Sequence, residues 1–436
     1  MHSARQRAED FLSSRGVDPD RIDMGRQCDL FLRDMARGLA GEPSSLPMIP
    51  TFIGVAGHVP RERPVIVLDA GGTHFRVAVV RFDGQGAPVV SSFSKHPMPG
   101  LDREVGKEKF FSTIVSYMRE VAGASPLVGF CFSYPTEMLP TRDGRLIRFV
   151  KQVRAPEVEG ELIGENLARA LRASGEGEKR VVVLNDTVAT LLAGLSARWG
   201  RRFDGYIGFI LGTGTNCCYI ERNACITKRA DLDPDRQQII NVESPDFDKV
   251  PAGELDRAFD RTTADPGRHI LEKMVSGAYL GPLVLFAARE AAGEGLFSAG
   301  AAGALLEMER LDTEQVDRFL SFPLGGDHPL GAAVGRGGRE DRVLLFHLVD
   351  RLLQRAALLS AVHLSAVVLR SGRGTDPCVP VCVTAEGSVF YGLKSLRQRM
   401  ECALRRFLVR EKERYPEIVQ VENATLIGAA IAGLTN

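Results

Sequence analysis

The chain has 436 residues, of which 44% are hydrophobic and 25% charged. These are ordinary globular values, and they exclude a disordered chain, a coiled coil and a collagen-like fibre. The 55 Lys and Arg residues balance the 55 Asp and Glu residues, so no net charge attracts nucleic acid or an anionic membrane. The 45 glycines exceed the usual share of about 7%. We expect the excess in turns, close packing or ligand-binding loops.

The cysteines and the N-terminus indicate the cellular setting. The eight cysteines include no C-x-x-C pair, and several lie in apolar runs, as Cys131 does, which is typical of reduced core thiols. The first residues are polar and lack the apolar stretch of a signal peptide. The most apolar helix candidate, between Arg355 and Arg370, has only about 14 residues, too few to cross a bilayer. We therefore expect a cytoplasmic protein with no membrane or nucleic-acid partner.

The first elements in chain order are helices and then a hairpin. Apolar residues recur at helical spacing over residues 1–45, and a series of prolines then breaks the pattern. The β-branched run 65–68, a glycine turn and the run 76–80 predict a β-hairpin. Residues 206–221 repeat this pattern of two strand-like runs joined by a glycine turn, and Gly72-Thr73 aligns with Gly214-Thr215 without a gap. The repeat suggests an internal duplication.

The later elements indicate a mixed α/β chain. The run 180–185 predicts a buried strand that feeds a helix near Asp186. Beyond residue 266 the pattern is mostly helical. The further elements expected there are a glycine-rich surface loop (325–338), a long helix through Leu359, a strand (380–384) that turns at 386–388, and a small-residue helix (424–434).

The two glycine turns could cradle phosphate. Their backbone N–H groups point into the turn and their glycines allow close approach, while Thr73, Thr213 and Thr215 add hydroxyl donors. An acid, Asp69, precedes only the first turn, and it could orient Mg²⁺ through water. Arg76 could contact a phosphate or form a structural ion pair. The alternative is a duplicated hairpin that only packs.

Several other site classes are excluded by missing motifs. The sequence has no G-x-x-x-x-G-K-[ST], because Gly106-Lys107 is followed by Glu108, and it has no G-x-G-x-x-G. These absences argue against a P-loop and against a Rossmann dinucleotide site. No H-E-x-x-H, G-x-S-x-G or zinc-binding cysteine set occurs either.

Asn185 and Asp186 stand where a predicted strand enters a helix. Both residue types favour such a position as helix N-caps. A carboxylate there would also lie at the mouth of an α/β sheet, where ligands bind, and phosphoryl transfer to an alcohol needs a carboxylate to accept the hydroxyl proton. Spacing alone leaves both interpretations open. Ser133, after an apolar strand, is ordinarily a loop start, and Glu272-Lys273 is ordinarily a solvated pair on a helix surface.

Taken together, these segments resemble the hexokinase family, sugar kinases of the actin-like ATPase superfamily. The resemblance has strong motifs from about residue 45 to about residue 285 and continues weakly to the C-terminus. The matching segments are a lead-in (45–51), the first phosphate motif (68–76), a sugar loop (130–135), the catalytic motif (184–188), the second phosphate motif (211–216), an Asn-x-Glu segment (241–243) and a long match at 266–281.

The resemblance implies an α/β, two-lobed actin-like ATPase (ribonuclease H-like) fold with a sugar and ATP cleft between the lobes. Residues 64–190 and the final helix, 425–436, would form the smaller lobe. Residues 191–424 would form the larger lobe, with the helical segment 1–63 packed on it. The protein would be a monomer or a homodimer.

The resemblance also implies an ATP-dependent kinase that phosphorylates the 6-hydroxyl of glucose or a similar hexose, with Asp186 as the general base. Asp69 and Asp186 would hold Mg²⁺ through water. Sugar hydroxyls would bind Ser133, Lys151, Asn185, Asp186, Asn216, Glu243 and Glu272. The nucleotide would bind Asp69, Gly71, Gly72, Thr73, Arg76, Gly212, Thr213, Gly214, Thr215, Gly387, Ser388, Thr425 and Gly428.

The chain also departs from the family pattern. Val150 stands where the family usually has Thr, Glu386 where Asp is usual, and Ala424-Thr425 where Gly-Ser is usual. These changes motivate an alternative, a catalytically weak sugar sensor with the same fold, although retention of Asp186 argues against it. A kinase of the repressor-like glucokinase group would need a cysteine-rich zinc segment, which is missing.

Overall fold

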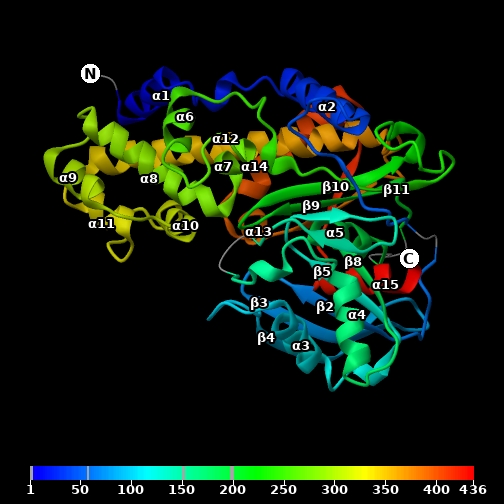
Figure 1. Cartoon of the computed structure of the whole chain (residues 1–436). Helices are drawn as coiled ribbons and strands as arrows, with labels where there is room; N and C mark the ends of the chain where they lie inside the picture. Colours follow the sequence, from blue (N-terminus) through cyan, green and yellow to red (C-terminus); the bar gives the residue numbers. More distant parts are fainter. Residues whose placement is uncertain (1–2, 56–57, 150–152, 197–200) are drawn as a thin grey trace.

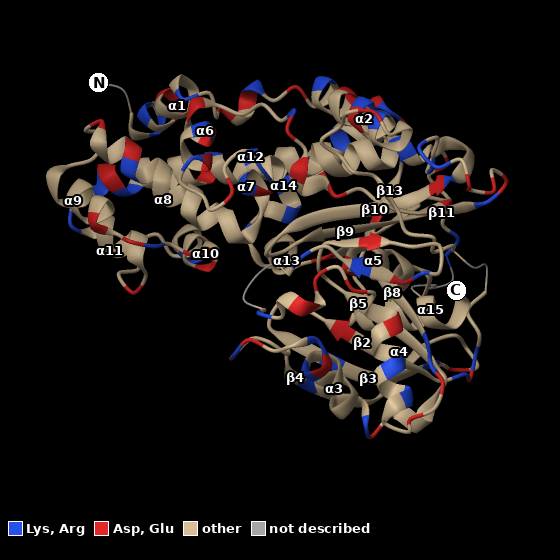
Figure 2. Cartoon of the chain, in the orientation of Figure 1, with Lys and Arg blue, Asp and Glu red and all other residues tan. Residues whose placement is uncertain are grey.

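The computed structural model describes residues 3–55, 58–149, 153–196 and 201–436. They form two α/β lobes, each built on its own sheet, with helices packed between and around the sheets (Figure 1). Positions of Lys and Arg and positions of Asp and Glu are interspersed along the ribbon of both lobes in Figure 2, in keeping with the zero net charge.

The smaller lobe contains a five-stranded sheet. Its strands, in spatial order, are β4 (Pro88–Pro97), β3 (His74–Phe82), β2 (Val65–Ala70), β5 (Leu127–Phe132) and β8 (Arg180–Leu184). The predicted first hairpin is the antiparallel pair β2 and β3, whereas β2, β5 and β8 run parallel. Their carboxyl ends therefore meet at one edge, which is where α/β sheets bind ligands. Helices α3 (Lys107–Met118) and α4 (Ile163–Ala173) cover one face.

The larger lobe contains a six-stranded sheet. Its strands, in spatial order, are β1 (Ile49–Pro50), β11 (Gln237–Asn241), β10 (Thr215–Arg222), β9 (Gly205–Leu211), β12 (Val381–Glu386) and β13 (Pro416–Val419). The second predicted hairpin is the antiparallel pair β9 and β10. Helix α12 (Arg339–Ser371) packs on this sheet, and the N-terminal helices α1 (Ala4–Ser14) and α2 (Met24–Ala40) pack on α12.

Two apolar helices, α5 (Asp186–Ala193) and α15 (Ala424–Thr435), lie between the two sheets and share one core with both. Their backbones approach closely because glycine stands at the crossings. A Cβ on Gly428 would lie 1.8 Å from the carbonyl oxygen of Ala189, and one on Gly129 of β5 would lie 1.8 Å from that of Ala429. Glycine is required at both positions because any side chain would collide with backbone.

The remaining helices extend the larger lobe, and a two-stranded sheet extends the smaller one. The helices are α6 (Glu254–Asp260), α7 (Ile270–Val275), α8 (Gly277–Gly293), α9 (Ala299–Glu307), α10 (Thr313–Ser321), α11 (Pro329–Gly335), α13 (Ser388–Gly392) and α14 (Leu396–Leu404), and the small sheet pairs β6 (Thr136–Met138) with β7 (Gly144–Leu146).

Two sequence-based expectations about helices are wrong. The glycine-rich stretch 325–338 is not only loop, because it contains α11, whose Leu330 is buried. Gly331 there serves close packing, since a Cβ would lie 1.9 Å from the carbonyl oxygen of Gly325. The predicted long helix and the apolar candidate 355–370 are one helix, α12. By length and composition it could cross a membrane, but 83% of its most apolar window is buried inside the protein.

Candidate active site

A cleft of about 320 Å³ opens between the lobes. Both lobes contribute polar side chains to its walls. From the smaller lobe come Asn185 and Arg148, and from the larger lobe come Asn241, Glu243, Asp246, Arg268 and His269. Two of these residues, Asn185 and Glu243, belong to the predicted sugar set, whereas Ser133, Asp186, Asn216 and Glu272 are not among the residues that line the cleft.

Asn185 and Asp186 stand at the start of α5. Asn185 is the N-cap, and its Oδ1 accepts a hydrogen bond from the backbone N–H of Thr187 at 2.9 Å. Asp186 is the first helical residue, and its Oδ1 accepts from the same N–H at 2.8 Å. The partial positive charge at a helix N-terminus attracts acidic side chains to this position. The cap and the candidate base are therefore two different residues.

A polar network on the larger lobe faces this helix end. Asn216 donates from Nδ2 to Glu243 Oε1 at 3.1 Å, and Asn241 donates to the same oxygen at 2.6 Å. Burial, together with the negative charge of Asp186, raises the pKa of Glu243 to about 7 against these hydrogen bonds. The network therefore brings Asn216, Glu243 and Asp186 together. Asn241 is absent from the predicted set, although it opens the Asn-x-Glu segment.

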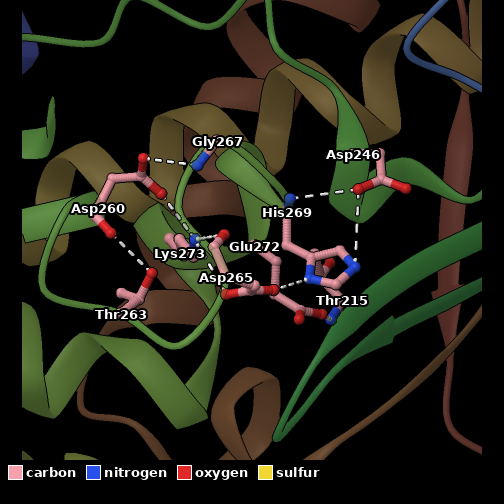
Figure 3. Close-up of polar contacts among 9 residues, drawn as sticks. All are labelled: Thr215, Asp246, Asp260, Thr263, Asp265, Gly267, His269, Glu272 and Lys273. Atoms are coloured by element: carbon pink, nitrogen blue, oxygen red, sulfur yellow. Dashed lines mark hydrogen bonds and ion pairs between the residues drawn. The ribbon is translucent and has the colours of Figure 1, made fainter. Parts of the chain in front are cut away.

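Glu272 connects α7 to the second glycine hairpin. Its Oε2 accepts a hydrogen bond from the backbone N–H of Thr215 at 3.0 Å. Burial raises the pKa of Glu272, and the Thr215 N–H opposes that rise. The interpretation of Glu272-Lys273 as a solvated surface pair is wrong. Lys273 is buried and its Nζ donates to Asp260 Oδ1 at 2.6 Å (Figure 3).

Ser133 and Lys151 complete the predicted sugar set. Ser133 follows β5, and its backbone N–H donates to the carbonyl of Ala70 at 3.2 Å, so it lies at the same sheet edge as the end of β2. The next residue, Tyr134, donates from its hydroxyl to the carbonyl of Gly71 in the first hairpin turn at 2.8 Å. Lys151 lies outside the described residues.

The first hairpin turn holds a buried carboxylate. Asp69 forms an ion pair with Arg76 and also accepts a hydrogen bond from Thr425 at 2.9 Å. Burial raises the pKa of Asp69, and the charge of Arg76 opposes the rise. Arg76 is thus part of an ion pair, while about a third of its side chain stays exposed. In the turn, Gly71 and Gly72 are half-buried and Thr73 is exposed.

The second hairpin turn is built into the larger lobe. The carbonyls of Gly212 and Thr213 accept hydrogen bonds from the first N–H groups of α8, at 2.8 and 3.0 Å. Thr213 is exposed, whereas Thr215 is buried and its hydroxyl donates to the carbonyl of Ile210. Gly214 packs on Glu272, because a Cβ there would lie 2.6 Å from its Oε2. In this turn the Thr213 side chain is therefore exposed, whereas the Thr215 hydroxyl is used in a hydrogen bond within the fold.

The last nucleotide candidates lie on α13 and α15. Ser388 is exposed at the start of α13, after Gly387, whose φ of 123° and contact with the Leu211 carbonyl require glycine. Thr425 reaches the first hairpin, whereas Gly428 is buried against α5. Ser388 therefore lies near the second hairpin turn and Thr425 near the first.

The sequence of this chain matches models of a known protein family. Sequence models described as hexokinase match residues 8–195 and residues 206–435, nearly the whole chain. The chain belongs to the hexokinase family. The family assignment made from the motifs is thereby confirmed.

Hexokinase relatives align over most of this chain. Hexokinase-5 of Oryza sativa subsp. japonica is 30% identical over 377 residues, which cover 80% of this chain and 73% of the relative. Hexokinase-1 of Schizosaccharomyces pombe is 28% identical over 426 residues, covering 93% of this chain and 86% of the relative.

Solved hexokinase structures share the fold. A Schistosoma mansoni hexokinase, solved with glucose, superposes with a TM-score of 0.79 at 24% identity, over 99% of this chain and 100% of that one. The ROK hexokinase of Thermus thermophilus reaches a TM-score of only 0.50 at 19% identity, over 85% of this chain and 97% of that one. The predicted α/β, two-lobed fold class is confirmed.

One carboxylate of this hexokinase-family site was missing from the predicted set. Glu386, at the end of β12, has its pKa raised by burial and then by the charges of Asp186 and Asp69, so the three acids lie near one another. Carboxylate oxygens are the ligands that Mg²⁺ prefers, and Mg²⁺ commonly keeps several waters. No three Asp, Glu, His or Cys side chains of the described chain come close enough to hold a metal directly. The acids fit Mg²⁺ held through water.

Proposed function

We propose that this hexokinase-family chain is an ATP-dependent hexose kinase that transfers the γ-phosphoryl group of ATP to the 6-hydroxyl of glucose or a similar hexose. The observation that carries the proposal is the place of Asp186. Its charge raises the pKa of Glu243 in the sugar network and of Glu386 and Asp69 beside the hairpin turns. A base for phosphoryl transfer must lie within reach of the hydroxyl that attacks the phosphate, so a carboxylate beside both the sugar network and the hairpin turns suits this role.

The sugar side of the proposal rests on hydrogen-bonding chemistry. Each sugar hydroxyl both donates and accepts, so a sugar site needs carboxylates and amides together. Asn216, Asn241 and Glu243 already form such a set, tied to one another at 2.6 to 3.1 Å. The predicted contacts of Ser133 and Lys151 with sugar, and the roles of Asn185 and Glu272, remain part of this proposal.

The chemical step follows from the position of the base. Asp186 accepts the proton of the 6-hydroxyl as the hydroxyl oxygen forms its bond to the γ-phosphorus. The bond between that phosphorus and the β–γ bridging oxygen breaks, and ADP leaves with the bonding electron pair. Mg²⁺, when bound with ATP, neutralises phosphate charge. Cleft closure on the sugar would exclude water, which would otherwise accept the phosphoryl group.

The nucleotide side of the proposal rests on the two hairpin turns. The exposed hydroxyls of Thr73 and Thr213 and the guanidinium of Arg76 would contact phosphates, with Gly71, Gly72, Gly212 and Gly214 allowing close approach. Ser388 would lie toward the nucleoside. Asp69 and Asp186 would hold the magnesium waters. We also propose a cytoplasmic setting, which is supported by the eight free cysteines.

A coupled assay with ATP, Mg²⁺ and a panel of glucose, mannose, fructose and N-acetylglucosamine tests the proposal. We expect sugar-dependent release of ADP with at least one sugar. Asp186→Ala should lower kcat by about 10²-fold or more, the usual contribution of a general base, while glucose binding measured by calorimetry is largely kept. The matched control is Asp235→Ala, an exposed aspartate, which should leave both quantities unchanged.

Two outcomes would overturn the proposal. If the protein binds glucose but releases no sugar-dependent ADP with any of the sugars, it is the sensor considered above. If Asp186→Ala stays within about tenfold of the parent kcat, Asp186 is not the base, because general-base catalysis contributes more than that.

A further inference from the structure

A lysine of the larger lobe holds the lead-in segment, residues 45–51, in place. Lys228 lies in the loop between β10 and β11, and its Nζ donates to the backbone carbonyls of Pro47 at 2.6 Å and Met48 at 2.8 Å. The segment adds only the two residues Ile49–Pro50 to the sheet. Lys228 therefore satisfies two carbonyls that lie outside the strand pairing.

The lead-in segment forms part of the cleft wall. Pro47, Ile49 and Thr51 line the cleft. Met48 has a φ of 49°, a left-handed conformation that a residue other than glycine keeps only where its surroundings hold it. The hydrogen bond from Lys228 to the Met48 carbonyl is one such support. A chemical change at Nζ would therefore act on the cleft wall.

The surroundings of Lys228 disfavour its charged form. Within the described parts of the chain, no carboxylate forms an ion pair with its Nζ, which donates to carbonyls instead. Asp231 of the same loop pairs with Arg229 at 2.7 Å. Glu42, at the end of α2, pairs with Arg37 at 3.8 Å. Burial, together with the positive charge of Arg229, lowers the pKa of Lys228 from 10.5 to about 8. A desolvated lysine beside another cation is activated as a nucleophile.

The two hydrogen bonds of Lys228 match a neutral amine. A neutral amine has two N–H groups and one lone pair, so the carbonyls of Pro47 and Met48 use both hydrogens and leave the lone pair free. An ammonium has a third N–H, for which the described residues provide no acceptor. The Lys228 side chain is half-buried, in contrast to the enclosed Lys273, so part of it remains open to solvent.

We propose that Lys228 is a modification site, whose Nζ is acylated by a short-chain acyl thioester. The nitrogen lone pair attacks the thioester carbonyl carbon and forms the C–N bond. The C–S bond breaks, and the thiolate leaves with the bonding electron pair and accepts the proton that the nitrogen loses. Acylation removes the positive charge of the lysine.

The amide that forms would loosen the lead-in segment. It has one N–H where the amine had two, so at least one of the Pro47 and Met48 carbonyls loses its donor. Because this segment lines the cleft, acylation should weaken sugar binding. This consequence rests on the proposed function, whereas the acylation itself does not.

The first test is the rate of acetylation of the purified protein by acetyl-coenzyme A, followed by mass spectrometry of its peptides. A pKa of about 8 leaves about a tenth of Lys228 neutral at pH 7, against less than about 0.1% of an ordinary lysine. Lys228 should be modified about tenfold faster than Lys109, an exposed lysine of α3, because its lower basicity offsets part of this advantage. The rate at Lys228 should level off above pH 8.

The second test is glucose binding by calorimetry before and after acetylation, in the parent and in Lys228→Arg. Arginine keeps the charge and donors for both carbonyls but does not form the amide. Acetylation at other lysines affects both proteins alike, so the loss of affinity should be about three- to tenfold larger in the parent. Lys228→Gln should resemble the acetylated parent, and Lys109→Gln, the matched control, should bind glucose as the untreated parent does.

The inference is overturned if Lys228 is acetylated no faster than Lys109. Its effect on the cleft is overturned if acetylation weakens glucose binding equally in the parent and in Lys228→Arg. Failure of the proposed function is a different result. In that case no sugar would produce release of ADP, while the difference in acetylation rate between Lys228 and Lys109 would persist.

Discussion

The hydroxyl of Thr425 donates a hydrogen bond to Asp69 Oδ2 at 2.9 Å, across 356 positions of sequence. The same carboxylate forms the ion pair with Arg76, whose guanidinium also reaches the Thr425 hydroxyl at 3.4 Å. Both Asp69 and Thr425 are buried. The C-terminal helix therefore supplies a hydrogen bond that the buried acid of the first hairpin needs.

Thr425→Val should uncouple this helix from the hairpin. Valine has the same shape but no hydroxyl, so the buried carboxylate loses a donor, which typically costs about 1–3 kcal/mol. We expect a higher KM for ATP and an unchanged KM for glucose. Thr425→Ser, which keeps the hydroxyl, is the control and should behave like the parent. Equal effects of the two variants would show that the hydroxyl does not matter.

Glucose binding should depend on pH through Glu243. Because its pKa is about 7, a rise from pH 6 to pH 8 converts it into the carboxylate, a better acceptor for sugar hydroxyls. Glucose affinity measured by calorimetry should therefore increase over this range. Glu243→Gln should bind glucose more weakly and without this pH dependence. An unchanged pH profile in the variant would assign the titration to another group.

The stability of the sugar-free protein should show the opposite trend for the same residue. The folded pKa of Glu243, about 7, lies above its ordinary value of 4.5. The contribution of Glu243 to the free energy of unfolding is therefore fully present below pH 4.5 and is lost as pH rises through 7. Chemical denaturation at pH 5 and pH 8 gives the free energy of unfolding of the parent and of Glu243→Gln. The parent's value should exceed the variant's by more at pH 5 than at pH 8.

A buried histidine should destabilise the protein in acid. His363 of α12 lies 2.8 Å from Cys217 Sγ, and burial lowers its pKa from 6.5 to about 3. The contribution of neutral His363 to the free energy of unfolding is present above pH 6.5 and is lost as pH falls toward 3, by roughly 1.4 kcal/mol per pH unit. His363→Leu should flatten the fall of the unfolding free energy between pH 6.5 and pH 4.5. His347→Leu, on the same helix, should keep the parent slope.

Gly428→Ala should separate the two helices between the sheets. The added Cβ would lie 1.8 Å from the Ala189 carbonyl oxygen, so one helix must move. Overpacking of this kind typically costs about 1–3 kcal/mol, and a lower melting temperature should report it. Gly303→Ala in α9 is the control, because a Cβ there meets nothing within 4 Å. It should stabilise the protein slightly, since alanine favours helix.

The sequence predicted those parts of the site that depend on local pattern. Both hairpins follow from β-branched runs on either side of glycine turns, and Asp186 at the start of α5 follows from a strand that runs into an N-cap. These features involve neighbours in the sequence, so a single sequence contains the information. The two-lobed α/β class, in contrast, is implied by the resemblance to the hexokinase family.

The rest of the site depends on contacts between distant residues. Lys273 looks like a surface lysine until Asp260 and Asp265 are brought around it. His269 carries no sequence signal for its left-handed backbone, which Asp246 and Asp265 impose. The glycines at 325–338 suggest a loop, but Gly331 is there because α11 packs against the Gly325 carbonyl.

The place of α15 between the sheets bears on how the chain folds during synthesis. This helix packs on β2, β5 and α5, and its residues 424–435 are separated from β8, the last strand of the smaller sheet, by most of the larger lobe. The smaller lobe therefore cannot bury the inner face of its sheet when its own strands leave the ribosome. Contacts of such long range slow folding. Until α15 is made, that apolar face is open to chaperones and to aggregation.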